Sequence, residues 1–300
     1  MKPTLTVFTP TYNRADCLTV AYEALKRQSS KDFCWLIIDD GSVDKTKELV
    51  ESWQKQNNGF EIKYIYKKNG GLASGYNVAI EAMDTELSVC VDSDDYLPDD
   101  AVEKIVRFWN KHGSEEYAGI VGLDCKPNGE VIGDLLPDQK TINLIDLCTG
   151  KYPIKNGDRK NVVRTELYKS VAPMKTFEDE GERDANPHFF HLKISKKYDF
   201  LVLNENLCFV DYQEGGMTTN VFKQYLRSPK SFREMRLLDM SFEGVPFKFT
   251  AKKTIHYVSS CLLSKQPCIK TSPRKLLTVL MYPFGVALTI YLKHTKREHV

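Results

Sequence analysis

Short apolar runs alternate with segments of helical spacing along the chain as far as residue 110. The apolar runs lie at 4–8, 33–38, 62–66 and 87–91. Apolar residues three and four positions apart follow each run, which predicts helices at 17–28, up to 53, at 74–83 and at 101–109. Asp16 is placed to cap the first of these helices. This alternation favours an α/β fold with a mostly parallel sheet and helices on both faces.

Three of the apolar runs end in polar clusters, at residues 9–14 (TPTYNR), 39–42 (DDGS) and 92–95 (DSDD). Ligands of such sheets bind at the carboxyl ends of the strands. We therefore expect the three clusters to line one crevice. No glycine-rich phosphate loop or Gly-x-Gly-x-x-Gly motif follows the first run. This absence argues against a nucleotide-sugar pyrophosphorylase and a dinucleotide-dependent oxidoreductase.

The side chains of these clusters suit a nucleotide bound together with a divalent cation. Asp92 and Asp94 offer hard oxygen ligands, and Mg²⁺ and Mn²⁺ prefer few protein carboxylates together with phosphates. Tyr12 can stack on a base, and Arg14 can approach phosphate. Asp40 can accept a hydrogen bond from the imide N–H of a uracil-like base. Taken one at a time, each cluster also fits an ordinary turn between a strand and a helix.

The pattern is weaker beyond residue 110. We expect a strand at 118–123, a loop-rich region over 124–160, an acidic loop at 176–184, a helix from 187 to about 197, and strands at 200–203 and 207–212. Asn186 and Pro187 are typical of the cap and first position of that helix. Residues 211–212 and 215–218 are interpreted as a loop on the acceptor side, or as an ordinary glycine turn.

Charge is divided unevenly along the chain. Positions 1–226 hold 28 Lys and Arg against 36 Asp and Glu, and positions 227–300 hold 14 against 4. The acidic body argues against nucleic acid as the main partner, and the basic end suits an anionic membrane surface or phosphate groups. The eight cysteines form no Cys-x-x-Cys pair, and the N-terminus lacks the pattern of a signal peptide. We expect a reducing, cytoplasmic location.

The tail contains an uncharged stretch at 276–292, between basic flanks. A helix of that length spans about 26 Å, short of the ~30 Å hydrocarbon core, and Pro283 and Gly285 interrupt it. We therefore expect an interfacial element that contacts the inner face of the membrane through residues 274–297. The alternatives are a C-terminal helix packed on the body and an apolar surface that forms a homodimer.

Together the motifs resemble glycosyltransferase family 2, whose members have the GT-A fold, a Rossmann-like sheet that binds nucleotide-sugars. The matching segments are 7–14 (VFTPTYNR), 35–46 (WLIIDDGSVDKT), Asn69-Gly70 with Asn77, and 89–100 (VCVDSDDYLPDD). The resemblance is strong over residues 3–110 and looser to about residue 215. It does not include the tail.

The resemblance implies a role for each motif. Asp40 would contact the nucleobase of a uridine nucleotide, and Asp92 would lie near the ribose or sugar. Asp94 would bind Mn²⁺ or Mg²⁺ on the donor diphosphate. The remaining donor-site residues would be Thr9, Pro10, Tyr12, Arg14, Asn69 and Ser93. The reaction would be a direct displacement with inversion at the sugar carbon, in which a general base takes the proton of the acceptor hydroxyl.

The general base is where this chain departs from the family pattern. Many members carry an acidic pair just before the helix that follows the acidic loop, and here Asn186 and Pro187 occupy those positions. We favour Asp184 as the base and Glu182 as the second choice. The alternative is that these acids only solvate a loop, and that the chain is a non-catalytic nucleotide-sugar-binding or scaffold member.

The predicted domains are a GT-A domain at 1–220, with the nucleotide-sugar side at 1–110 and the acceptor side at 111–220, and a helical extension at 221–300. Residues 224–228 (QYLRS) nearly match the Gln-x-x-Arg-Trp motif of processive synthases but lack its tryptophan. The missing tryptophan favours transfer of a single sugar, and the basic, apolar tail favours an acceptor hydroxyl on a lipid-linked surface-polysaccharide intermediate.

Overall fold

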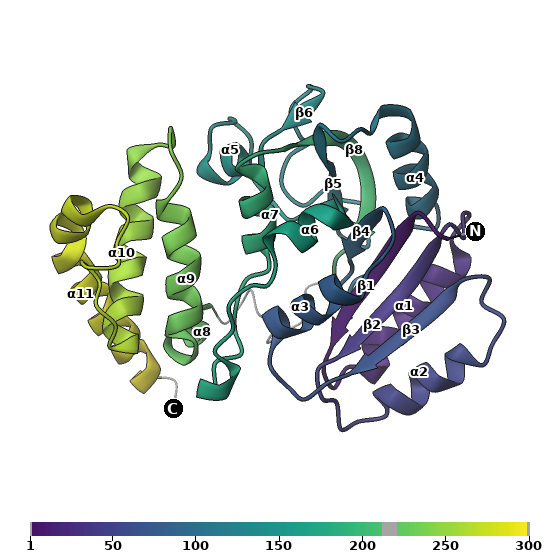
Figure 1. The fold of residues 1–300 in the computed structure, drawn as a ribbon, viewed down its shortest axis with the longest axis horizontal. Coiled ribbons are helices and arrows are strands. Elements are labelled where there is room, and N and C mark those ends of the chain that lie inside the picture. Colours follow the sequence, from purple (N-terminus) through teal and green to yellow (C-terminus); the bar gives the residue numbers. More distant parts are fainter. Residues whose placement is uncertain (1, 212–220, 299–300) are drawn as a thin grey trace. The chain divides into compact units, whose positions relative to one another are not determined.

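The computed structural model describes residues 2–211 and 221–298, with only the backbone described over 295–298 (Figure 1). The predicted acceptor-side loop at 215–218 therefore lies outside the described residues. The chain divides into two compact units. The first comprises residues 1–69, 75–173 and 190–213, and the second comprises 70–74, 174–189 and 214–300.

One mixed sheet forms the frame of the first unit. Within the described residues it has eight strands in the order β3-β2-β1-β4-β7-β5-β8-β6. The pairs β3-β2, β2-β1, β1-β4 and β5-β8 are parallel, and the others are antiparallel. The strands are β1 (Leu5–Thr11), β2 (Phe33–Asp39), β3 (Glu61–Tyr66), β4 (Leu87–Cys90), β5 (Tyr117–Cys125), β6 (Thr141–Ile142), β7 (Arg159–Arg164) and β8 (Asp199–Phe209).

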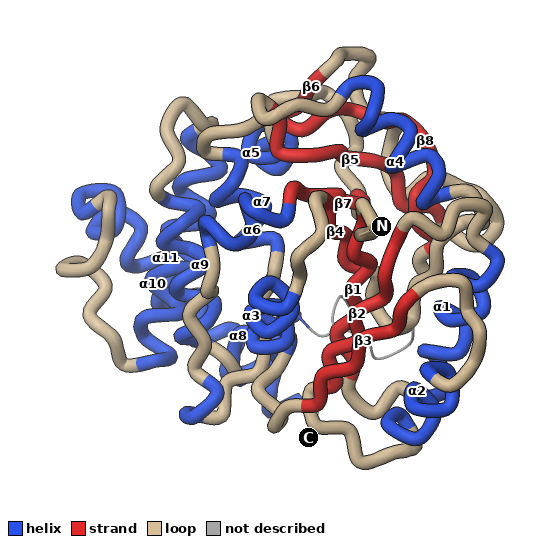
Figure 2. Tube along the Cα trace, turned by 45° about the vertical axis from the view of Figure 1, so that its right-hand side comes forward, coloured by secondary structure: helices blue, strands red, loops and turns tan. Residues whose placement is uncertain are grey.

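Helices cover both faces of this sheet, as the sequence predicts (Figure 2). Successive side chains of a strand point to opposite faces, so Val7 and Phe8 of β1 belong to different layers. Val7 packs in a core with residues of α1, α2 and α4. Phe8 contacts the rings of Tyr76 and Tyr168, from α3 and α6. The α-helices before residue 200 are α1 (Ala15–Arg27), α2 (Thr46–Gln54), α3 (Leu72–Ala82), α4 (Ala101–His112), α5 (Leu144–Thr149), α6 (Thr165–Val171) and α7 (His188–Ser195), and a short 3-10 helix covers Glu178–Glu180 of the acidic loop.

The predicted elements are confirmed as far as residue 110, and so are the strand at 118–123 and the helix from 187, which are β5 and α7. The region 124–160, expected to be rich in loops, also contains the short elements β6 and α5 and the start of β7. The two strands expected at 200–203 and 207–212 are the single strand β8, whose pairing with β5 shifts register between Val121 and Leu123. An irregularity of this kind bends a strand without ending it.

The cap of α1 also differs from the prediction. Asp16 lies inside the first turn of the helix and makes no side-chain capping bond. The backbone N–H of Ala15 instead donates to Asp44 Oδ2, 3.1 Å away in the loop after β2. A carboxylate from another loop thus performs the capping, because it satisfies a free N–H at the helix start.

The described helices of the second unit include α8 (Val221–Arg227), α9 (Pro229–Met240), α10 (Phe247–Ser264) and α11 (Lys275–Glu298). Met240, Tyr257, Val258 and Cys261 form the buried cluster between α9 and α10. The expectation that Pro283 and Gly285 interrupt the tail is wrong, since α11 continues through both. Pro283 is exposed, so water can satisfy the carbonyl that the proline ring frees.

Candidate functional site

The carboxyl ends of three strands lie side by side in the first unit's sheet. β1 lies between β2 and β4 and is parallel to both, so the polar clusters after the three strands are neighbours. β1 continues to Thr11, which corrects the interpretation of residues 9–14 as a turn. Thr9 is buried, and its hydroxyl accepts a hydrogen bond from the indole N–H of Trp35 at 3.0 Å. Pro10 is likewise a buried strand residue.

Hydrogen bonds join the loop after β1 to the loop after β2. Asn13 has a positive φ of 51°, a conformation that asparagine tolerates better than most residues. In this conformation its N–H donates to Ser42 Oγ and its Oδ1 accepts from the N–H of Val43, both at 2.8 Å. The preceding residue, Tyr12, is 49% exposed. The bonds thus fix the backbone beside an aromatic ring that can stack on a ligand.

Asp40 is buried at the end of β2 and is paired with a cation. The Nζ of Lys67 lies 2.7 Å from Asp40 Oδ1. The side-chain amide of Asn69 donates to the backbone oxygen of Asp40 at 2.9 Å and to Oδ2 at 3.1 Å. The structure therefore brings the predicted residues Asp40 and Asn69 together. Lys67, from the end of β3, is an addition that the sequence pattern did not indicate.

Asp92, Ser93 and Asp94 follow β4. Asp94 Oδ2 accepts a hydrogen bond from Arg14 Nη1 at 2.6 Å, so the predicted phosphate-binding and metal-binding residues form a pair. Burial alone would lower the pKa of Arg14, but the hydrogen bond and charge of Asp94 raise it above its ordinary value. Both partners remain partly exposed, and Asp92 is exposed while Ser93 is buried. The pair can therefore meet a ligand from solvent.

A buried ionic cluster lies next to residues 92–94. Lys160 of β7 places its Nζ 3.7 Å from Asp95 Oδ2 and 3.6 Å from Asp124 Oδ1. All three residues are buried. Burial raises the pKa of Asp95 to about 8 and that of Asp124 to about 6. The cluster holds Asp95, the residue next to Asp94, and so fixes the base of the predicted metal-binding loop.

The carboxylate of Glu182, in the second unit, accepts hydrogen bonds from the start of α9. Its Oε1 accepts from the N–H of Lys230 at 3.0 Å. Its Oε2 accepts from the N–H and hydroxyl of Ser231 at 2.8 and 2.9 Å. The carboxylate thus satisfies free N–H groups of the helix and suits the positive end of its dipole. These bonds give Glu182 a structural role.

Asp184, also in the second unit, is buried and bound to two consecutive residues. Arg227 donates from Nε and Nη2 to its two oxygens, at 2.7 and 2.5 Å. The hydroxyl of Ser228 donates to Oδ2 at 2.8 Å and accepts from the N–H of Asp184 at 3.0 Å. The Arg227 side chain is 62% exposed, whereas that of Asp184 is 7% exposed. Displacement of an exposed arginine would free one side of this carboxylate.

The carboxylates of residues 92–95 after β4, here called the donor loop, fit a cation that is shared with a ligand. Among the residues that the structure describes, no three His, Cys, Asp or Glu side chains lie close enough to hold a metal ion. Asp92 and Asp94 supply oxygen atoms, which Mg²⁺ and Mn²⁺ prefer, and these ions commonly complete their shell with phosphates and water. The donor set therefore fits a cation that is bound together with a diphosphate.

Comparison with known families places this chain. Residues 6–159 match the model of Glycosyl transferase family 2, slightly more than half of the chain. The chain belongs to glycosyltransferase family 2. Among curated relatives, TuaG of Bacillus subtilis, named for teichuronic acid biosynthesis, is 30% identical over 107 residues, 36% of this chain and 42% of TuaG. The chain spans less than half the length of the curated relatives that it matches.

Solved structures share the fold over nearly the whole chain. TarS of Staphylococcus aureus (residues 1–349, in complex with UDP-GlcNAc) is 19% identical, with a TM-score of 0.59 over 96% of this chain and 81% of that chain. The mannosyltransferase PcManGT of Pyrobaculum calidifontis, in complex with GDP-Man and Mn²⁺, is 14% identical, with a TM-score of 0.59 over 97% of this chain and 88% of that chain. The predicted GT-A fold with C-terminal helices is thus confirmed.

Proposed function

We propose that this chain moves one sugar from a UDP-sugar to an acceptor hydroxyl, with inversion at the sugar carbon. The observation that carries the proposal is the gathering of Asp40, Tyr12 and the Arg14–Asp94 pair at three adjoining strand ends. This edge offers groups for a base, a ring to stack on, and charges for a diphosphate. Nucleotide-sugars bound to TarS and PcManGT, which share the fold, support the assignment.

Each of these groups has a task toward the donor. Asp40, which is paired with Lys67 at 2.7 Å, accepts a hydrogen bond from the imide N–H of uracil. Tyr12 stacks on the base, and Arg14 stabilises charge on the departing diphosphate. Asp94 would hold Mn²⁺ or Mg²⁺, which supplies further neutralisation of the diphosphate when bound, and Asp92 would lie near the ribose or sugar.

We propose Asp184 as the general base. The acceptor oxygen forms a bond to the anomeric carbon while the bond from that carbon to the diphosphate oxygen breaks. The acceptor proton passes to the Asp184 carboxylate, and the electron pair leaves with the nucleoside diphosphate. Asp184 is preferred to Glu182 because its main partner, Arg227, is exposed, whereas Glu182 holds the start of a helix.

The proposed acceptor is a lipid-linked intermediate of a surface polysaccharide at the inner face of the membrane. The basic, apolar tail and the teichuronic acid name of TuaG support this proposal. Serine follows Arg227 where the Gln-x-x-Arg-Trp motif of processive synthases has tryptophan, which favours transfer of a single sugar.

A second candidate function is nucleotide-sugar binding without turnover. Asn186 and Pro187 stand where many members carry their acidic pair, and Pro187 cannot accept a proton. In addition, the carboxylates of Glu182 and Asp184 are both bound to other groups. This candidate predicts donor binding with no release of UDP.

A UDP-release assay with a panel of UDP-sugars separates the two candidates. The catalytic proposal expects release by the wild type and a loss of about 10²–10⁴-fold in Asp184→Asn, with UDP affinity retained. The control is Asp179→Asn, at another acid of the same loop, which should keep full activity. Absence of release by wild type that binds UDP would favour the non-catalytic candidate.

A further inference from the structure

Helix α11 shows the reverse of the usual distribution of side chains. Several of its large apolar residues are exposed, among them Leu276 at 85%, Leu280 at 65% and Phe284 at 57%. Its buried positions hold mostly small or hydroxyl residues. They are Thr278, Gly285, Thr289 and Leu292.

The two sets of residues lie on opposite sides of the helix. At 3.6 residues per turn, the apolar stripe spans an arc of about 140°, and the buried positions centre about 180° from its middle. The exposed residues of this stripe are Leu276, Val279, Leu280, Pro283, Phe284, Ala287, Ile290 and Tyr291. A surface helix of a water-soluble protein turns its apolar stripe inward. Small residues at the helix contact and large apolar ones outside are typical of helices that face lipid.

The buried side of α11 is held firmly against α10, which keeps the apolar side outward. A Cβ on Gly285 would lie 2.4 Å from Val258 Cγ1, so only glycine permits this approach. Thr289 Oγ1 donates to Ser259 Oγ at 3.0 Å. At the start of the helix, the guanidinium of Arg274 donates to the backbone oxygens of Met240 and Phe242 at 2.8 and 2.6 Å.

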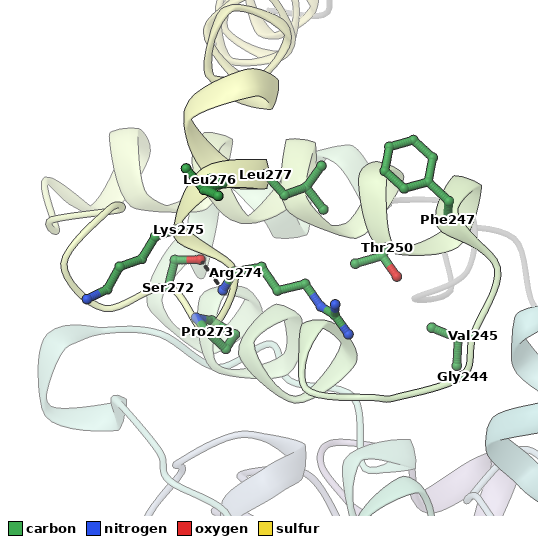
Figure 3. Close-up of a pocket in the computed structure, with 10 residues that line it drawn as sticks. All are labelled: Gly244, Val245, Phe247, Thr250, Ser272, Pro273, Arg274, Lys275, Leu276 and Leu277. Carbon is green, nitrogen blue, oxygen red and sulfur yellow. Dashed lines mark hydrogen bonds between the residues drawn. The ribbon is translucent and has the colours of Figure 1, made fainter.

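Basic groups accompany the apolar side. Lys275 precedes the stripe and Lys293 follows it, and both are exposed. Near the start of α11, the exposed side chains of Phe247 and Leu276 line one groove together with Lys275 (Figure 3). The chain from residue 227 to its end holds 14 Lys and Arg against 4 Asp and Glu. This combination complements a surface with an apolar interior and anionic groups at its boundary with water.

We propose that this side of α11 lies in the surface of an anionic phospholipid bilayer, with the helix axis parallel to the membrane. By length and composition Lys275–His294 is apolar enough to cross a membrane, yet a core helix of that kind would be mostly buried, and 22% of its most apolar stretch is buried. A crossing orientation would carry its partner α10, with Lys248 and Lys252 exposed, into hydrocarbon at a high cost for each lysine. The parallel orientation leaves these lysines in water.

The proposal deepens the proposed function, since it places the enzyme on the surface that would hold a lipid-linked acceptor. It is tested without donor or acceptor, so it can fail while sugar transfer stands. The experiment is flotation of the full chain with vesicles of phosphatidylcholine alone or mixed with phosphatidylglycerol. The test variant is Leu276→Gln/Leu280→Gln/Phe284→Gln. The control is Val20→Gln, at an exposed apolar position of α1.

The wild type and the control should float with anionic vesicles and much less with neutral ones. The triple variant should partition at least about a hundredfold more weakly. Lys275→Gln/Lys293→Gln should weaken binding to anionic vesicles about tenfold or more and leave neutral vesicles unchanged. Thermal unfolding midpoints close to that of the wild type would show that the variants fold.

Three results would overturn the proposal. The first is wild type that stays at the bottom of the gradient and sediments as a dimer that the triple variant abolishes, since α11 would then join two copies of the chain. The second is a triple variant that floats as well as the wild type. The third is binding that resists both high salt and an alkaline carbonate wash, because that behaviour indicates a membrane-spanning helix.

Discussion

The donor loop and the acidic loop each contain an aspartate bound to an arginine, but the two pairs differ in burial. Asp94 and Arg14 both keep part of their side chains in solvent, whereas Asp184 is 7% exposed beneath an exposed Arg227. An exposed pair can exchange its partner for a ligand at small cost. Removing the partner of a buried carboxylate leaves a charge without compensation. The first pair is thus suited to binding, and the second to a proton acceptor that stays covered until its arginine moves.

The largest effect is expected behind the donor loop, where burial is deepest. Lys160→Met removes the cation that faces Asp95 and Asp124, and we expect a loss of about 3–5 kcal/mol in the free energy of unfolding. Urea denaturation measures this loss. Lys47→Met, at an exposed lysine of α2, should change it by less than about 0.5 kcal/mol. An equally small change in the free energy of unfolding of Lys160→Met would show that the buried ionic cluster does not stabilise the donor loop.

Asp40 tests the nucleobase side of the same region. Asp40→Ala removes the predicted acceptor and the partner of Lys67, so UDP affinity should fall about 10–100-fold. Asp40→Asn keeps the size of the side chain and should recover part of the affinity. Calorimetry with UDP measures both. Unchanged UDP affinity in Asp40→Ala would show that the nucleobase is bound by other residues.

Glu182→Gln sharpens the contrast within the acidic loop. The amide retains one acceptor but loses the charge at the start of α9, and the free energy of unfolding should fall by about 1–2 kcal/mol. Because Glu182 is structural in this account, UDP release per folded molecule should stay near the wild-type value. A loss of UDP release as large as that expected for Asp184→Asn would identify Glu182 as the general base.

Stability should also depend on pH through the buried cluster. The pKa of Asp95 is raised from an ordinary value of about 3.9 to about 8, so the folded chain keeps a proton that the unfolded chain releases. Stability therefore falls as pH rises from about 4 to about 8, by at most about 1.4 kcal/mol per pH unit. Urea denaturation between pH 5 and 8 should show a flatter slope in Asp95→Asn. Asp124→Asn should flatten only the part below about pH 6. A wild-type profile that rises over this window would contradict the assignment.

The fold up to residue 110 could be predicted because its signals are local. Each buried run, such as FCWLII at β2, stands next to its own helix, and parallel order follows from that alternation. β7 was missed because its sequence, RKNVVR, begins with charged residues and its partners β4 and β5 lie far away along the chain. Lys160, the centre of the ionic cluster, was missed with it.

The side chains of the site could be predicted by type, but their partners could not. Arg14 and Asp94 were assigned to one donor site, and they form a pair although they lie far apart in the sequence. By contrast, the sequence 176–184 ranks Asp184 above Glu182 only because Asp184 lies nearer to positions 186 and 187, and it does not show which groups each carboxylate binds. Their difference arises from Lys230, Ser231 and Arg227, which come much later in the chain. Long-range contacts thus decide which carboxylate is structural.

The most direct test of the account is calorimetric binding of UDP, with and without Mn²⁺, to the wild type and to Asp94→Ala. Asp99→Ala, at an exposed aspartate a few residues further on, is the matched control. We expect the wild type and the control to bind UDP with an affinity that Mn²⁺ increases, and Asp94→Ala to lose that increase. Equal binding by Asp94→Ala and the wild type in the presence of Mn²⁺ would contradict the proposed donor site.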